Sequence, residues 1–250
     1  MDYARFRPRL LFKRAIEKTL NFNYDVSLPA GADLFVDFRK YLPNFEPKIV
    51  FDVGANVGES AEAYVRHFPE SRVFSFEPLL GTFEQLKRNV AGFPNVECFN
   101  FGLSSKAGNV HMVYSPTQSN LSSITIPEPG KPTVEVQVET LERFCKERAI
   151  ARIDFLKIDT EGHDLEVLKG AERLLRSHSV GAVQVESAMS PLNKTHVDFQ
   201  AFRDYLEPKR YYLFMLYDQT PESRNGKPNL RRTNPVFISC KLIDENNTKR

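Results

Sequence analysis

Short runs of apolar residues alternate with amphipathic stretches along most of the chain, from about residue 48 onward. The apolar runs are rich in β-branched and aromatic side chains, which predicts buried strands. The predicted strands are residues 48–53, 72–77, 96–101, 110–114, 134–138, 153–159, 180–186, 211–217 and 235–240. The predicted helices are residues 59–68, 82–90, 165–175 and 199–206, together with a short helix that holds Leu141 and Phe144 and is capped by Thr140.

The order of these elements indicates the fold class. Strands that alternate with helices are typical of an α/β domain with a mostly parallel sheet, because parallel strands need a crossover between them. The last two strands follow one another without a helix, so we expect them to form an antiparallel pair at the end of the sheet. The sequence therefore predicts a doubly wound, Rossmann-like, mostly parallel sheet with a C-terminal antiparallel strand pair.

The first 47 residues lie outside this pattern. Residues 1–20 interleave basic and apolar side chains, which is compatible with an amphipathic helix. We expect residues 1–47 to form an N-terminal helical extension that packs on a domain of residues 48–250. A helix of this composition can also bind a membrane surface or an acidic partner, and the sequence leaves this alternative open.

Composition and charge narrow the class of protein. Apolar residues make up 41% and charged residues 26% of the chain, as in ordinary globular proteins. The net charge of +2 does not favour nucleic acid as a partner. Cys98, Cys145 and Cys240 are widely spaced, which indicates a reducing, cytoplasmic location rather than a disulfide or zinc framework. No apolar run reaches the length of a membrane span, about 20 residues.

A glycine-containing loop follows the first predicted strand and opens the first helix of the domain. Gly54 permits a sharp turn and a close approach of a ligand, and Gly58 lets the helix begin close to the strand. Glu77 ends the second strand, where a carboxylate can accept hydrogen bonds from both hydroxyls of a ribose. This pattern predicts a site for a cofactor that contains a nucleoside.

The residues around the two glycines discriminate between cofactors. Asn56 occupies the position of the middle glycine in the dinucleotide fingerprint, and Asp52 would repel a pyrophosphate. S-adenosylmethionine carries an ammonium group, which Asp52 can bind directly or through water, and a carboxylate, which backbone N–H groups can bind. We therefore predict S-adenosylmethionine as the cofactor. A dinucleotide and a purely structural turn are the alternatives.

Several blocks of the sequence resemble FkbM-type methyltransferases, a branch of the class I methyltransferases. The blocks are IVFDVGANVGES at 49–60, VFSFEP at 73–78, VETLERF at 138–144, IDFLKIDTEGHDLEVLKGAERLL at 153–175 and VQVE at 183–186. The resemblance implies a seven-stranded sheet and the transfer of a methyl group, mostly to oxygen, on sugars, polyketides and other natural products. The resemblance covers about residues 48–187. Residues 1–47 and 188–250 match the family little, so the resemblance does not identify the acceptor.

The resemblance also implies site residues. The cofactor would be bound by Asp52, Gly54, Asn56, Gly58 and Glu77, with Asn100, Phe101 and Gly102 near the adenine. Asp159 and Glu161 would face the methionine part of the cofactor or the acceptor.

A hydroxyl acceptor needs to lose its proton during methyl transfer. Asp159, Glu161 and His163 follow a central strand, and ligands of open α/β sheets bind beyond the carboxyl ends of strands. We predict these three residues as catalytic, with His163 as the general base because its ordinary pKa suits that role; a solvent-exposed helix residue is the alternative for it. Glu186, at the end of the next strand, is a weaker candidate. These side chains can also ligate a metal ion, but their spacing is not diagnostic and no metal is predicted.

Other polar residues show no partner in the sequence. The histidines His67, His111, His178 and His196 are predicted to be surface or structural residues. The basic residues Arg224, Lys227, Arg231 and Arg232 are expected to form a solvated loop, with an acidic acceptor as the alternative.

Other functions are compatible with the predicted fold. A nucleic-acid methyltransferase is disfavoured by the balanced charge and by the absence of an Asn/Asp-Pro-Pro-Tyr run after the central strand. A non-catalytic module that binds a nucleoside cofactor on the same fold is another alternative, although the intact set of Asp52, Gly54, Gly58 and Glu77 argues against a decayed cofactor site. A nicotinamide-dependent oxidoreductase is disfavoured by Asn56. The sequence therefore predicts an S-adenosylmethionine-dependent O-methyltransferase whose partner is a small-molecule acceptor, a sugar or another natural product.

Overall fold

The computed structural model describes residues 28–113, 132–222 and 229–248. The chain divides into two compact units, Met1–Ala30 and Gly31–Arg250, and every helix and strand described below belongs to the second. Residues 1–27 lie outside the described residues, so the amphipathic helix predicted near the N-terminus stays a prediction. The polar loop that contains Arg224 and Lys227 also lies partly outside them.

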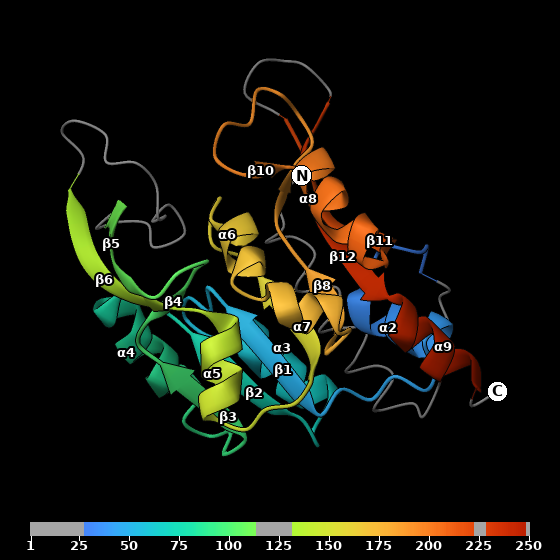
Figure 1. Ribbon diagram of the computed structural model, residues 1–250, viewed down its shortest axis with the longest axis horizontal. Coiled ribbons are helices and arrows are strands. Elements are labelled where there is room, and N and C mark those ends of the chain that lie inside the picture. The colour runs from blue at the N-terminus through green and yellow to red at the C-terminus, as the bar shows by residue number, and fades with distance from the viewer. Residues whose placement is uncertain (1–27, 114–131, 223–228, 249–250) are drawn as a thin grey trace, which may run out of the picture. The chain divides into compact units, whose positions relative to one another are not determined.

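The main sheet is mostly parallel and confirms the predicted fold class (Figure 1). Its seven longer strands lie in the order β3 (Val96–Phe99), β2 (Arg72–Phe76), β1 (Ile49–Val53), β7 (Ile153–Ile158), β8 (Val180–Gln184), β12 (Leu230–Ser239) and β11 (Tyr211–Pro221). The first five are parallel to one another, whereas β12 is antiparallel to both β8 and β11. The predicted C-terminal antiparallel pair is therefore present.

The structure adds strands that the sequence pattern did not separate. The two-residue strands β9 (Ser187–Ala188) and β10 (Val197–Asp198) extend the main sheet to nine strands. A second sheet has the order β4 (Gly102–Leu103), β6 (Thr133–Glu139) and β5 (Gly108–Val113). The runs near residues 110 and 134 therefore pair with each other and not with the main sheet, because the chain turns away from it after β3.

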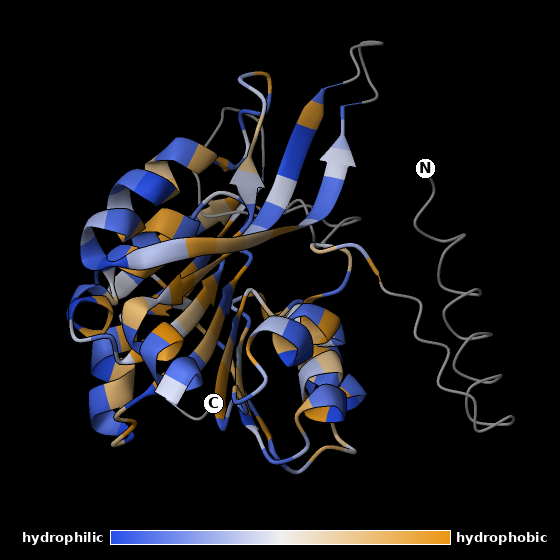
Figure 2. Ribbon diagram, turned by 90° about the vertical axis from the view of Figure 1, so that its right-hand side faces the viewer, coloured by the Kyte–Doolittle hydropathy of each residue, from blue (hydrophilic) through white to orange (hydrophobic). Residues whose placement is uncertain are grey.

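Helices cover both faces of the main sheet. They are α2 (Leu34–Tyr41), α3 (Glu59–His67), α4 (Leu80–Asn89), α5 (Leu141–Glu147), α6 (Asp164–Lys169), α7 (Glu172–Arg176), α8 (Phe199–Leu206), the 3₁₀ helix η3 (Glu207–Lys209) and α9 (Cys240–Thr248). Thr140 caps α5 as predicted, because its hydroxyl accepts the N–H of Arg143 at 3.2 Å. Figure 2 shows hydrophobic strands between helices that carry many hydrophilic residues.

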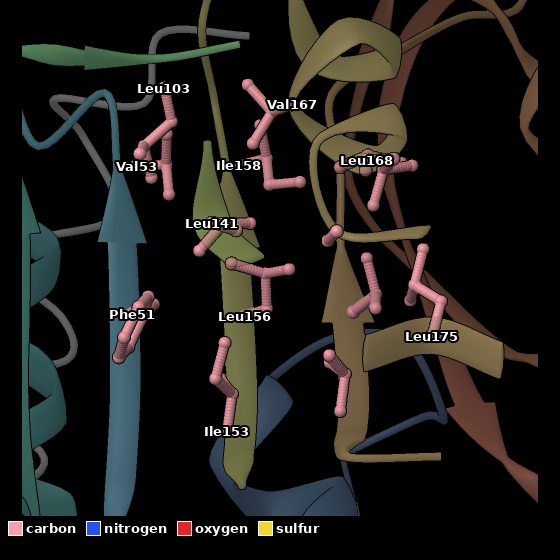
Figure 3. Packing of buried hydrophobic residues seen from close by; sticks show 14 of the residues in the cluster. Phe51, Val53, Leu103, Leu141, Ile153, Leu156, Ile158, Val167, Leu168 and Leu175 are labelled. Carbon is pink, nitrogen blue, oxygen red and sulfur yellow. The ribbon is translucent and has the colours of Figure 1, made fainter. Parts of the chain in front are cut away.

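The two faces of the sheet form separate hydrophobic cores, since side chains alternate along each strand. Phe51, Leu156 and Ile158 point to the face that is covered by α5, α6, α7 and α8 (Figure 3). Val50 and Phe155 point to the opposite face, where α2, α3, α4 and α9 pack. Because the sheet is buried on both faces, the carboxyl ends of its parallel strands hold the loops that follow them in fixed positions.

The single helix predicted over residues 165–175 is wrong, because two short helices, α6 and α7, replace it. They are separated at Gly170, whose added Cβ would lie 2.1 Å from the carbonyl oxygen of Ser104. The Gly170 carbonyl accepts the N–H of Glu142 at 3.1 Å instead of continuing a helix. The close backbone contact therefore interrupts an otherwise helical pattern.

In the part of the chain that the structure describes, no helix has both the length and the apolar character needed to cross a bilayer.

We expect Gly170→Ala to destabilise the domain, since the new methyl group has to displace the Ser104 backbone. Overpacking of this kind costs about 1–3 kcal/mol. Urea denaturation followed by circular dichroism measures the change. The control is Gly81→Ala in α4, where no atom lies within 4 Å of the added Cβ. Equal stability of the two variants would contradict the assignment of Gly170 as a steric constraint.

Candidate functional site

A cavity lies beyond the carboxyl ends of β1, β2 and β7. Its lining consists of Val53, Gly54, Asn56, Phe76, Glu77, Pro78, Leu79, Gly102, Leu103, Met112, Asp159, Thr160 and Glu161. Six residues predicted for the site are among them, namely Gly54, Asn56, Glu77, Gly102, Asp159 and Glu161. The structure thus brings together side chains from three strand ends that are far apart in the sequence.

The glycine loop shapes the floor of this cavity. Gly54 has a φ of 76°, and an added Cβ would lie 1.9 Å from the carbonyl oxygen of Asp159. The loop is also held by the carbonyl of Phe76, which accepts the N–H groups of Gly54 and Ala55, both at 3.0 Å. Gly58 does not line the cavity; it has a φ of 93° and begins α3, where an added Cβ would lie 2.8 Å from Leu86 Cδ1.

Glu77 is hydrogen-bonded to the glycine loop. Its carboxylate accepts the N–H of Asn56 at 3.1 Å and the N–H of Leu79 at 2.9 Å. Burial raises the pKa of Glu77 to about 7, against the effect of these two hydrogen bonds. The carboxylate is therefore held in a defined position and titrates near neutral pH.

Only one of the three residues predicted near the adenine lines the cavity. Gly102 is part of the lining. Asn100 does not line the cavity but holds two residues that do, since its Nδ2 donates to the carbonyls of Glu77 and Pro78, both at 3.0 Å. Phe101 packs in the hydrophobic core, with its ring centroid 5.6 Å from that of Phe76.

Asp52, which was predicted to bind the ammonium group of the cofactor directly or through water, is fully buried and does not line the cavity. Its Oδ1 lies 3.2 Å from Nζ of Lys157, which also lies 3.4 Å from Oδ2 of Asp159. Burial by itself would lower the pKa of Lys157, but the two carboxylates raise it above its ordinary value. Asp52 therefore acts on the cavity through Lys157, which orients Asp159.

The segment after β7 turns sharply to present Glu161. Glu161 has a left-handed φ of 53°, and the next residue, Gly162, has a φ of 103°. Asp164 supports this turn, because its Oδ2 accepts the hydroxyl of Thr160 at 2.7 Å and its Oδ1 accepts the N–H of Glu186 at 3.0 Å. The strained backbone and the buried support place the Glu161 carboxylate in the cavity wall.

His163 is not brought to the cavity, in contrast to its predicted role as general base. Its Nε2 lies 2.9 Å from the hydroxyl of Ser104, and the residue precedes the first residue of α6. Burial lowers the pKa of His163. Although His163 lies only two residues after Glu161, its imidazole therefore contacts Ser104, next to the second sheet, and does not line the cavity.

Sequence reasoning missed a different histidine. His196 is buried, with its Nε2 at 2.7 Å from Glu186 Oε2 and 3.3 Å from Glu161 Oε2. Arg232 pairs with Oε1 of Glu186, so it is not the solvated loop residue that was predicted. The position of Glu186 at a strand end was a sequence signal, but His196 lies in a connecting segment without any pattern.

We expect Lys157→Met to destabilise the domain, because it leaves Asp52 buried without its cation. Breaking a buried ion pair on one side costs about 3–5 kcal/mol. Urea unfolding measures the loss, and the double variant Asp52→Asn, Lys157→Met is expected to recover part of it. The control is Lys87→Met, where the lysine side chain is 52% exposed. A Lys157→Met variant as stable as this control would refute the assignment.

The cavity lining fits an adenosyl cofactor with a cationic end. Phe76, Leu79, Leu103 and Met112 provide apolar surface for a purine, and Glu77 lies where ribose hydroxyls can donate to it. Asp159 and Glu161 end β7, on the other side of β1 from β2. They supply negative charge at the end of the cavity away from Glu77, which suits a sulfonium and an ammonium group.

Comparison with known proteins agrees with this geometry. The model of the methyltransferase FkbM domain matches residues 52–214. The methyltransferase sdnD of Sordaria araneosa is 30% identical over 174 residues, which cover 56% of this chain and 67% of that protein. The hexuronic acid methyltransferase AglP of Haloferax volcanii is 29% identical over 151 residues, covering 60% of this chain and 61% of that protein. The matched region is therefore about two thirds of each relative.

A solved structure shares the fold. The crystal structure of methyltransferase FkbM from Methylobacillus flagellatus superposes with a TM-score of 0.52 at 18% identity, covering 77% of this chain and 44% of that chain. The family match spans the glycine loop, Glu77 and the segment from Asp159 to Glu161, the same parts that form the cavity. The chain thus belongs to the FkbM methyltransferase family, with S-adenosylmethionine as its cofactor.

Proposed function

We propose that this protein methylates a hydroxyl oxygen of a sugar or another small natural product. The observation that supports this most strongly is the continuous cavity, which has Glu77 at its β2 end and two carboxylates at its β7 end. The relative AglP is named for hexuronic acid, a sugar whose nucleophilic groups are hydroxyl and carboxylate oxygens. The carboxylates of Asp159 and Glu161 at the β7 end of the cavity can accept hydrogen bonds from the hydroxyl groups of such an acceptor.

The chemistry requires orientation and removal of one proton. When bound, S-adenosylmethionine supplies a methyl group on a cationic sulfur; the acceptor oxygen bonds to this carbon as the carbon–sulfur bond breaks and its electron pair stays on sulfur. The protein holds the acceptor in line and excludes competing water. A carboxylate at the cavity wall then accepts the hydroxyl proton.

Asp159 is the residue that we assign to the acceptor proton. It lines the cavity with a side chain that is 33% exposed, and Nζ of Lys157 holds its Oδ2 at 3.4 Å. Glu161 is placed to accept a hydrogen bond from the same or a neighbouring hydroxyl, because it lines the cavity one residue beyond Thr160. His163 is left out of this scheme, since it faces Ser104. A small-molecule rather than nucleic-acid acceptor and a cytoplasmic location remain part of the proposal.

We expect Asp159→Asn and Glu161→Gln each to lower kcat for methyl transfer by about 10²-fold or more, as for loss of a general base or an orienting hydrogen bond. The assay incubates the protein with S-adenosylmethionine and a panel of hexuronic acids, hexoses and their glycosides, and detects methylated product by mass spectrometry. Glu135→Gln, at an exposed position of β6, is the control. Wild-type turnover in both cavity variants would contradict the assigned roles.

We expect the affinity for S-adenosylmethionine to rise as the pH increases from about 6 to about 8, because the ionised Glu77 accepts the ribose hydroxyls and its pKa is raised to about 7. Isothermal titration calorimetry across this range measures the dependence. Glu77→Gln is expected to bind more weakly at pH 8 and to show a flat profile. A parent protein with the same affinity at both ends of the range would exclude this role of Glu77.

A further inference from the structure

Three ligand-type atoms converge at the β7 end of the cavity. They are Oε2 of Glu161, Oε2 of Glu186 and Nε2 of His196, and all lie within 4.8 Å of one another. The residues come from the segment after β7, the segment after β8 and the segment before β10. Their convergence is therefore a product of the fold and not of one local motif.

The hydrogen-bond pattern around His196 identifies which ring nitrogen carries the proton. Oδ1 of Asn193 accepts the N–H groups of Thr195 at 3.1 Å and of His196 at 3.3 Å, so this atom is an oxygen. The same Oδ1 lies 3.0 Å from Nδ1 of His196, which therefore donates to it. A neutral His196 consequently presents a lone pair at Nε2.

That lone pair faces two carboxylate oxygens. Glu186 Oε2 and His196 Nε2 are buried, and while His196 is neutral no hydrogen-bond donor among the described residues satisfies either atom. Glu186 is 1% exposed, and the side chain of His196 is 3% exposed. Unpaired buried acceptors are costly, so these three electron-pair donors require either a proton on Nε2 or a shared cation.

The distance from His196 to Glu161 matches an edge of a metal coordination sphere, and the distance to Glu186 is a few tenths of an ångström shorter. With bonds of about 2.1 Å, two ligand atoms lie about 3.0 Å apart at a right angle and about 3.4 Å apart at a tetrahedral angle. Nε2 of His196 lies 2.7 Å from Glu186 Oε2 and 3.3 Å from Glu161 Oε2. We propose that Glu161, Glu186 and His196 bind one divalent cation, of the kind that takes carboxylate and imidazole ligands, such as Mn²⁺.

The surroundings support the ligands as in known metal sites. His196 donates its other ring N–H to an amide oxygen, which sets the ring orientation and the tautomer. Arg232 occupies Oε1 of Glu186 and leaves Oε2 for the ion. Asp164 holds the N–H of Glu186 at 3.0 Å, and Gly162 packs so closely on Thr195 that an added Cβ would lie 2.1 Å from its carbonyl oxygen.

The site opens toward the cavity, because Glu161 is a lining residue while the other two ligands are buried behind it. A cation held here would lie next to the cavity wall at Glu161. It would bind the acceptor hydroxyl and lower its pKa, which makes proton loss to Asp159 easier. This use of the ion rests on the proposed function, whereas binding of the ion does not.

The first test measures binding of Mn²⁺ to the full chain after treatment with EDTA and its removal. Electron paramagnetic resonance of free Mn²⁺ during the titration gives the number of sites and the Kd, without methyl donor or acceptor. We expect one ion per chain and a rise in Tm on addition of Mn²⁺. Failure of methyl transfer with intact Mn²⁺ binding would refute the proposed function alone; the reverse result would refute the metal site alone.

Variants assign the bound ion to this site. We expect His196→Gln and Glu161→Gln to abolish binding, and Asn193→Ala to weaken it by about 10–100-fold through loss of the imidazole support. The matched control replaces His111 and Glu135, an exposed cross-strand pair on β5 and β6, by glutamine. Circular dichroism checks that each variant is folded.

One further measurement keeps the proposal falsifiable if a variant does not fold. The ¹⁵N chemical shifts of His196 in the parent protein distinguish a neutral ring that binds a metal from an imidazolium that donates to Glu186. An imidazolium at pH 8 with no bound Mn²⁺, Mg²⁺ or Zn²⁺ would overturn the proposal and leave an ion pair in its place. A neutral ring whose Nε2 resonance broadens or shifts with added Mn²⁺ would support it.

Discussion

The buried ammonium of Lys157 connects the core of the sheet to the site. It lies between Asp52 on β1 and Asp159 at the end of β7, and two of these three side chains are almost completely shielded from water. Charges in such a position are stable only as a set, since each would be strongly destabilising without the others. The position of Asp159 in the cavity therefore depends on a residue, Asp52, that no ligand in the cavity touches.

The close contact between the glycine loop and β7 adds a second constraint at the same place. Gly54 lies against the backbone of Asp159, so the two central strands end in direct contact. The carbonyl of Phe76 holds the loop from the other side. Three adjacent strands thus share one network of backbone contacts, and a ligand that spans them meets a surface whose shape is already set.

Negative charge is distributed unevenly along this surface. Glu77 stands alone beside β2, with a pKa raised to about 7 by burial, whereas Asp159 lies beside the ammonium of Lys157. Methyl transfer removes the positive charge from sulfur, so carboxylates at the β7 end bind the methyl donor more strongly than the neutral thioether product. Glu186 and His196, which lie behind Glu161, extend this polar region beyond the cavity wall at the β7 end.

Contiguous signals in the sequence were enough to predict the succession of strands and helices along the chain, the terminal antiparallel pair, the glycine loop and Glu77, because periodicity and turn chemistry act over a few neighbouring residues. The placement of Asp52 depended on the pleat, which points Val53 into the cavity and the preceding side chain to the opposite face. The interruption at Gly170 and the partner of His163 depended on Ser104, which follows β4 of the second sheet. Only the tertiary structure decided that Glu161, Glu186 and His196 meet. These residues lie after β7, after β8 and before β10, and no local sequence pattern indicates which of these segments will come together.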